Sequence, residues 1–133
     1  MRDIRFRAWD KKKNDWFDED SGHLYIDLNG NINFGWNGEI MDDYTDRIIL
    51  MQYTGFKDIN GVEIYEGDIL KWTDFEMNNT TINPVYLEGT TPIFNVYVDE
   101  LIYATTLLTL NKIKDGYFEV IGNIYENPEL LED

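Results

Sequence analysis

Short stretches of alternating apolar and polar residues, separated by turn residues, are the feature that most restricts this chain to a β fold. The first stretch, IRFRAW, places Arg5, Arg7 and Trp9 on one face of a strand and apolar side chains on the other. Similar stretches recur along the chain without an internal repeat or a linker. The pattern predicts a mainly-β protein with little helix.

Asn-Gly dipeptides mark several of the expected turns. In HLYIDLNGNINFGW, Asn29 and Gly30 predict a hairpin with a type I′ turn, because both residue types tolerate positive φ. A second Asn-Gly pair, Asn37 and Gly38, is expected to end the following strand. The next apolar stretch, RIILMQYTG, is apolar on both faces and is therefore expected to be an interior strand.

The second half of the chain is less regular. Residues 74–84, DFEMNNTTINP, predict a long mobile loop because they are polar and rich in turn residues. For residues 99–114 the sequence leaves helix and strand open, with extended structure followed by a helical turn near 107–113 favoured. Gly122 predicts a bulge in a last strand, and Asn127 with its following proline predicts the start of a short helix before an acidic tail.

The charge of the chain restricts its partners. Its formal net charge is −15, and residues 72–133 carry 2 basic against 11 acidic groups. Such a surface repels nucleic-acid phosphates and anionic membranes and attracts basic proteins or cations. Because the chain has no cysteine, disulfides and thiolate metal sites are excluded. Without an apolar leader or a long apolar run, we expect a soluble cytoplasmic protein that does not act at a membrane.

Catalytic and metal motifs are weak throughout. Ser21 and His23 are the chain's one serine and one histidine, and they lie in an acidic loop with no nucleophile-elbow pattern. The Asp-rich stretches beginning at Asp18 and Asp58 place glycine in the wrong register for a calcium loop. The carboxylates around Gly67 are better explained by turn formation, in which Asp68 accepts backbone hydrogen bonds. We expect no enzyme, no cofactor and no metal site.

The N-terminal strand raises a different possibility. Arg5, Arg7 and Trp9 on one face resemble the cation and aromatic surfaces that bind single-stranded nucleic acid. The alternative is an edge strand protected by cations, and the net charge favours that alternative. Nucleic-acid binding through this strand therefore stays a secondary hypothesis.

Three stretches carry a family resemblance: IRFRAWD (4–10), MQYTGFKDINGVEIYEGDIL (51–70) and VIGNIYENPELL (120–131). In this order they resemble the YopX family of small bacteriophage and prophage proteins. The resemblance implies a phage or prophage gene, a bacterial cytoplasm and a mainly-β fold whose C-terminal half is a small SH3-like β-barrel. It implies no biochemical activity and no catalytic residues. We expect one chain unit with an N-terminal β subdomain at 1–56 and a barrel subdomain at 57–133.

These observations favour a non-enzymatic protein-binding module that engages a host or phage protein, and a basic protein is one option. The candidate binding residues are aromatic, and their alternative role is core packing: Tyr53, Tyr65, Trp72 and Tyr125. A second hypothesis is an acidic mimic of DNA that inhibits a host nucleic-acid-binding protein. A homo-oligomer is also possible, because small β domains have edges to cover.

Overall fold

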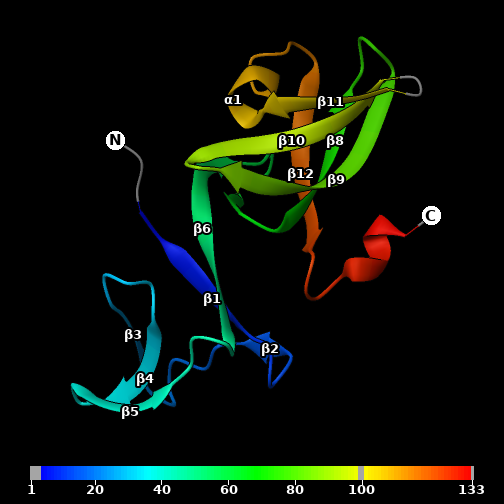
Figure 1. The fold of residues 1–133 in the computed structure, drawn as a ribbon. Helices are drawn as coiled ribbons and strands as arrows, with labels where there is room; N and C mark the ends of the chain where they lie inside the picture. The colour runs from blue at the N-terminus through cyan, green and yellow to red at the C-terminus, as the bar shows by residue number, and fades with distance from the viewer. Residues whose placement is uncertain (1–3, 99–100, 133) are drawn as a thin grey trace. The chain divides into compact units, whose positions relative to one another are not determined.

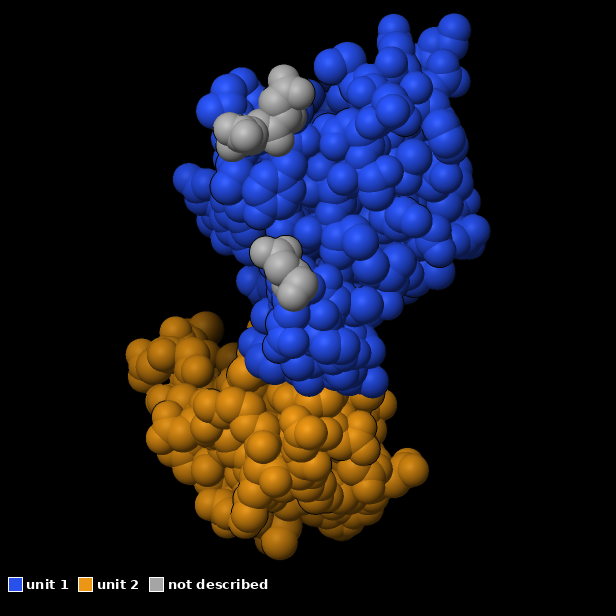
Figure 2. Space-filling view, turned by 90° about the vertical axis from the view of Figure 1, so that its right-hand side faces the viewer, with its two compact units in different colours: residues 1–6, 52–133 blue, residues 7–51 orange. Residues whose placement is uncertain are grey.

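The computed structural model describes residues 4–98 and 101–132. The chain folds as two compact units, the first made of residues 1–6 and 52–133 and the second of residues 7–51 (Figure 2). Both units are built from antiparallel strands, which confirms the predicted mainly-β fold with little helix (Figure 1). The proposed subdomains at 1–56 and 57–133 stay a prediction.

The second unit contains short strands and strand segments. Their bounds are β1 Phe6–Asp10, β2 Asp15–Trp16, β3 His23–Ile26, β4 Ile32–Trp36, β5 Glu39–Asp43 and the first part of β6 Ile48–Lys57. Strands β3, β4 and β5 form a three-stranded sheet. Strand β6 is an interior strand in the order β2-β1-β6-β7, where β7 is Glu63–Tyr65 of the first unit. The interior position expected for RIILMQYTG is therefore confirmed.

The two Asn-Gly pairs of this unit form different turns. Asn37 and Gly38 have φ angles of 53° and 82° and join β4 directly to β5, as a type I′ turn does. Gly30 has a φ of 85°, but Asn29 does not have a positive φ, and five residues separate β3 from β4. The type I′ turn predicted at Asn29 was wrong, because Asp27 closes a longer loop there.

The first unit contains one five-stranded sheet and two short helices. Its elements are the second part of β6, β7 Glu63–Tyr65, β8 Asp68–Asp74, β9 Asn79–Glu88, β10 Thr91–Val98, β11 Leu101–Thr106, α1 Leu107–Leu110, β12 Gly116–Asn123 and the 3-10 helix η1 Pro128–Leu131. The sheet order is β11-β10-β9-β8-β12, so the last strand of the chain pairs with β8 (Figure 1).

Strand β9 corrects the long loop predicted at residues 74–84. Only residues 75–78 lie between β8 and β9, and Asn79 already pairs with Asp74. The polar residues that suggested a loop point their side chains at β10. Asn79 Nδ2 donates to Tyr97 O at 2.7 Å, and Asn83 Nδ2 donates to Asn95 O at 2.7 Å. Side-chain hydrogen bonds thus replace part of the β9–β10 backbone ladder, whose paired residues on β10 are Thr91–Phe94.

The C-terminal predictions agree with the structure with one exception. Residues 101–106 are extended and α1 follows at 107–110, as expected, whereas residue 99 lies outside the described residues. The pairing of β12 with β8 shifts register between Val120 and Gly122, which confirms the bulge. Helix η1 begins at Pro128, but Asn127 does not cap it. Instead, Asn127 Oδ1 accepts a hydrogen bond from Asn123 N at 3.2 Å.

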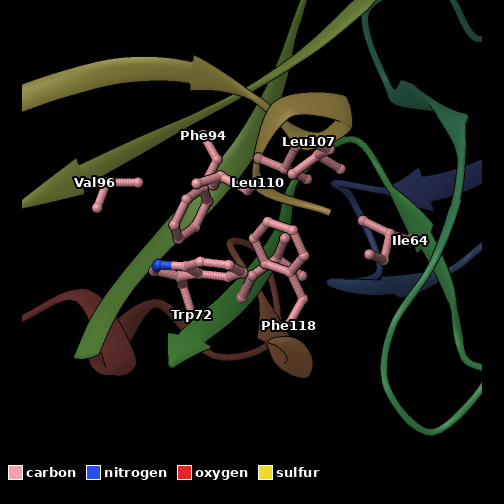
Figure 3. Packing of buried hydrophobic residues seen from close by; sticks show 9 residues of the cluster. Ile64, Trp72, Phe94, Val96, Leu107, Leu110 and Phe118 are labelled. Carbon is pink, nitrogen blue, oxygen red and sulfur yellow. The ribbon is translucent and has the colours of Figure 1, made fainter. Parts of the chain in front are cut away.

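The core of the first unit lies against the five-stranded sheet (Figure 3). The Trp72 ring lies 4.8 Å from Phe118, and Phe94 meets Phe118 edge-on at 5.5 Å. The two buried leucines of helix α1, Leu107 and Leu110, also belong to this cluster. Burial of aromatic rings of this size supplies much of a small domain's stability.

Aspartates close the hairpin loops of both units. Asp27 Oδ1 accepts from Asn29 N and Asn31 N, both at 2.9 Å. Asp58 Oδ1 accepts in the same way from the second and fourth residues after it, at 2.9 and 2.8 Å. Asp10 and Asp74 each accept from the amides two and three residues ahead. Part of the chain's acidity therefore serves to satisfy backbone donors in turns.

Candidate functional site

Two of the predicted binding residues form a cross-strand pair in the first unit. Tyr53 on β6 is directly opposite Tyr65 on β7, and their ring centroids are 5.5 Å apart. The Arg5 guanidinium lies over the Tyr53 ring, 4.5 Å from its centroid, and also forms an ion pair with Glu63. Tyr53 is buried, whereas Tyr65 is half-buried. The pair therefore combines a fixed ring with one that reaches solvent.

Glu66 follows Tyr65 in the chain and influences the pKa of Tyr125, another of the predicted binding residues. Its backbone N donates to Gln52 O at 2.9 Å, and its carboxylate accepts from Gln52 N at 3.2 Å. Burial raises the pKa of the Tyr125 phenol, and the negative charge of Glu66 raises it further. Tyr125 itself is half-buried. We call Arg5, Tyr53, Glu63, Tyr65, Glu66 and Tyr125 the tyrosine cluster.

Trp72 lies elsewhere. It is 1% exposed, and its ring packs on Phe118 within the core cluster (Figure 3). A residue added at Gly116 would place its Cβ 2.4 Å from this ring, which shows how closely the core encloses it. Trp72 therefore acts in packing, the alternative role that the sequence left open, and has no exposed face to offer a partner.

The tyrosine cluster combines phenol, guanidinium and carboxylate groups. Phenol, guanidinium and carboxylate groups can form hydrogen bonds, ion pairs and aromatic contacts with a protein surface. Within the described parts of the chain, no group of three or more His, Asp or Glu side chains could hold a metal ion. Arg5 was predicted only as part of a secondary nucleic-acid hypothesis, and it was not among the four aromatic candidates for protein binding. Its place with Arg7 and Trp9 on one face of the first strand was the available signal.

The other candidate residues have structural roles. Ser21 Oγ donates to Asp18 O at 2.7 Å, and the exposed His23 begins β3. The His23 ring stacks on Trp36 with 5.5 Å between centroids and 8° between planes. Asp68 Oδ2 accepts from Tyr65 N at 2.8 Å beside Gly67, so its predicted turn role is confirmed.

The basic face of β1 is occupied within the second unit. Trp9 is 3% exposed and meets Trp16 edge-on, with 5.1 Å between ring centroids. The Arg7 guanidinium lies over the Trp16 ring at 4.9 Å. A base cannot stack on a tryptophan that is buried, so the surface proposed for single-stranded nucleic acid lacks its aromatic platform.

Comparisons with known proteins agree with this architecture. The family model described as YopX protein matches residues 5–132. The chain belongs to the YopX family. It is 25% identical over 136 residues to the SPbeta prophage-derived uncharacterized protein YopX of Bacillus subtilis (strain 168), covering 96% of this chain and 95% of that protein. The relative's description assigns no activity to it.

Two crystal structures resemble the chain over its length. Protein YopX from Bacillus subtilis superposes with a TM-score of 0.63 at 26% identity, covering 99% of this chain and all of that one. A protein from Enterococcus faecalis superposes with a TM-score of 0.51 at 27% identity, with the same coverage. Among the helices that the structure describes, none has the length and apolar character needed to cross a membrane.

Proposed function

We propose that this YopX-family protein is a phage or prophage accessory protein that binds a host or phage protein without enzymatic activity. The observation that carries the proposal is the tyrosine cluster, in which the half-buried Tyr65 pairs with a Tyr53 ring that Arg5 covers, and Arg5 also forms an ion pair with Glu63. Tyrosine and arginine are enriched among the residues that dominate protein–protein binding energy. The relative's prophage origin supports a phage role in the bacterial cytoplasm.

The support for a tyrosine-centred interface is its preorganisation. Cross-strand pairing places Tyr65 opposite the buried Tyr53, and the Arg5 guanidinium lies over the Tyr53 ring. A side chain already held in one arrangement loses little conformational entropy when it binds. The carboxylates of Glu63 and Glu66 would then select a partner that carries basic residues.

We also propose that the five-stranded sheet is an SH3-like small barrel. One support is the strand order β11-β10-β9-β8-β12, in which β12, the last of these strands along the chain, pairs with β8, the first of them along the chain. A second support is the helical turn α1 between β11 and β12. Small barrels of this kind bind partners beside their loops, an inference that rests on analogy of fold.

The experiment is affinity capture from the bacterial host after nuclease treatment, with the wild-type protein beside a Tyr65→Ala, Tyr125→Ala double variant. We expect one partner to be retained by the wild type and to be lost, or bound about 30-fold more weakly, by the variant. Direct titration of the purified partner then measures the affinity. The matched control is Tyr86→Ala, which removes an exposed tyrosine of β9 that is outside the cluster.

Failure has a distinct signature. If the double variant and the Tyr86→Ala control bind the partner equally well, the tyrosine cluster is not the interface. If a partner is held only at low salt and released from both variants alike as salt rises, acidity rather than the cluster carries binding. That second pattern, with a nucleic-acid-binding protein as the partner, is the result expected for the DNA mimic.

The DNA-mimic alternative draws on the net charge of −15. A mimic needs carboxylates that are free to face the partner in a phosphate-like row. Many of the aspartates instead accept backbone hydrogen bonds in loops, and Asp10 is paired with Arg47. These commitments favour the protein-binding module over the mimic.

A further inference from the structure

The edge strand β11 has the composition of an interior strand. Its six residues, LIYATT, include no charged residue and no proline, in a chain that is 28% charged. Leu101, Ile102 and Tyr103 are consecutive, so they lie on both faces of the strand, and they are 59%, 60% and 51% exposed. Natural sheets usually protect such an edge with charges, prolines or bulges.

Its backbone also has an unpaired side within the described residues. All six residues of β11 pair with β10, in a ladder from Ile93 and Thr106 to Val98 and Leu101. The sheet order ends at β11, so in the described parts of the chain no strand lies on its outer side (Figure 1). Exposed apolar side chains continue onto the neighbouring elements, at Tyr97 of β10 and Leu108 of α1.

The outer half of the β10–β11 hairpin is an arm held differently from the rest of the sheet. Beyond Phe94, β10 is bound to β9 through the side chains of Asn79, Thr81 and Asn83. The exposed apolar residues of β11 lie on this arm, opposite β10 residues 96–98. Where β11 approaches the core again, its threonines are half-buried and Leu107 is fully buried. Within β11, the exposed apolar residues are therefore confined to the arm.

We propose that β11 pairs edge to edge with β11 of a second copy of this chain, as antiparallel strands related by a two-fold axis. An isologous contact of this kind covers both unpaired edges and closes the assembly as a dimer. The two ladders would join into one continuous sheet, and the apolar side chains on each face of β11 would pack against their counterparts.

The occupant that we infer is a second copy, because the uncharged, apolar sequence of β11 is complementary to itself. Two chains of net charge −15 repel one another at most surfaces, so they can approach closely only where charge is absent. Strand β11 is such a place, and its own sequence supplies the uncharged strand, apolar on both faces, that fits it.

The test measures the mass of the purified full chain by sedimentation velocity over a wide concentration range. We expect a concentration-dependent dimer, and we expect Ile102→Lys to weaken it by at least about tenfold by placing a solvated charge on the edge. The substitution makes the net charge less negative, so weaker association could not come from added repulsion. Leu28→Lys is the matched control, because Leu28 is a fully exposed leucine in the loop after β3 of the second unit.

A cysteine scan gives a second, independent measurement. Because the chain has no cysteine, any disulfide formed by a single introduced cysteine joins two copies. We expect one or two of the variants Ile102→Cys, Tyr103→Cys and Ala104→Cys to form a dimer rapidly on mild oxidation, since only residues near the two-fold axis meet their own copies. Leu28→Cys should oxidise slowly.

Either of two results overturns the proposal. One is a wild-type chain that stays monomeric at the highest concentration, which would leave β11 to a different protein's strand or to solvent. The other is a dimer that Ile102→Lys and Leu28→Lys affect equally, with cysteine crosslinking no faster at β11 than at Leu28. Circular dichroism of each variant, expected to match the wild type, confirms that the exposed substitutions leave the fold intact.

Discussion

Asp58 is expected to be the most important single carboxylate for the stability of the first unit. Its Oδ1 atom closes the loop before β7 by accepting two amides of that loop. Its Oδ2 atom accepts from Val120 N at 2.9 Å, and Ile59 N donates to Phe118 O at 2.9 Å. The side chain is 8% exposed, so water cannot readily replace it. Asp58 therefore both shapes a loop and attaches it to β12.

The size of the effect can be worked from these contacts. A hydrogen bond to a charged group contributes about 1.5–3 kcal/mol, and a buried donor left unsatisfied costs about 1–3 kcal/mol. In Asp58→Ala, the loop amides can turn toward water, but Val120 N loses its acceptor inside the bulged strand. We expect a loss of about 3 kcal/mol in the free energy of unfolding. Asp58→Asn keeps an acceptor for the loop but presents an amide donor to Val120, and should cost about 2 kcal/mol.

Asp27 provides the matched control, because its loop has the same sequence pattern and the same backbone hydrogen bonds. The second oxygen of Asp27 accepts from Asn31 Nδ2 at 3.0 Å, a contact within its own exposed loop. Asp27→Ala should therefore cost only about 1 kcal/mol. Urea unfolding followed by circular dichroism measures the free energies, and amide exchange at Val120 localises the change. Equal losses in the two alanine variants, or a Val120 amide that stays protected in Asp58→Ala, would refute this account.

Three further predictions concern pH and packing. The pKa of Asp10 is lowered, chiefly by its hydrogen bond to Arg47. The contribution of Asp10 to stability is therefore present above its ordinary pKa of 3.8 and is lost as pH falls through the folded value. Asp10→Asn should make stability depend less on pH in this acid range. The pKa of Tyr125 is raised by burial and by Glu66, so its contribution is present below the usual 10.0 and is lost as pH rises through the folded value. Glu66→Gln should lower that pKa. The titration of Tyr125 is isolated by subtracting the ultraviolet titration curve of the Glu66→Gln, Tyr125→Phe double variant from that of Glu66→Gln alone. Gly116→Ala should cost about 2 kcal/mol in urea unfolding, because its Cβ would meet the core tryptophan ring at 2.4 Å; a loss below about 0.5 kcal/mol would show that the ring moves aside.

The sequence predicted those strand features that a hydrophobic pattern or a glycine indicates directly. The interior strand β6 and the bulge at Gly122 followed from residue type alone. Strand β9 was mistaken for a loop because its Asn and Thr side chains donate to a neighbouring strand, a role that polar residues in a sequence do not distinguish from solvation. Strand β5 was missed because all five of its residues are exposed.

Of the binding residues, the sequence could identify aromatic candidates but not their surroundings. The separation of Trp72 from the tyrosines depends on which neighbours the fold brings to each ring, and these neighbours are distant in sequence. The same holds for the two Asn-Gly pairs. Identical dipeptides formed different turns because Asp27 stands two residues before Asn29, whereas a tryptophan directly precedes Asn37. An aspartate two residues before Asn-Gly is a signal that can be used in other sequences.

The aspartate-closed loops bear on how this chain can change during evolution. At each such loop, replacing the aspartate with lysine would remove the acceptor that the turn amides use. Substitutions at these aspartates that would make the protein less acidic therefore also destabilise a turn. The isoelectric point of about 4.2 is then partly a by-product of how many hairpins the chain makes. Relatives that keep these hairpins should stay acidic whatever they bind, and a relative that has lost its acidity should have shorter or differently closed loops.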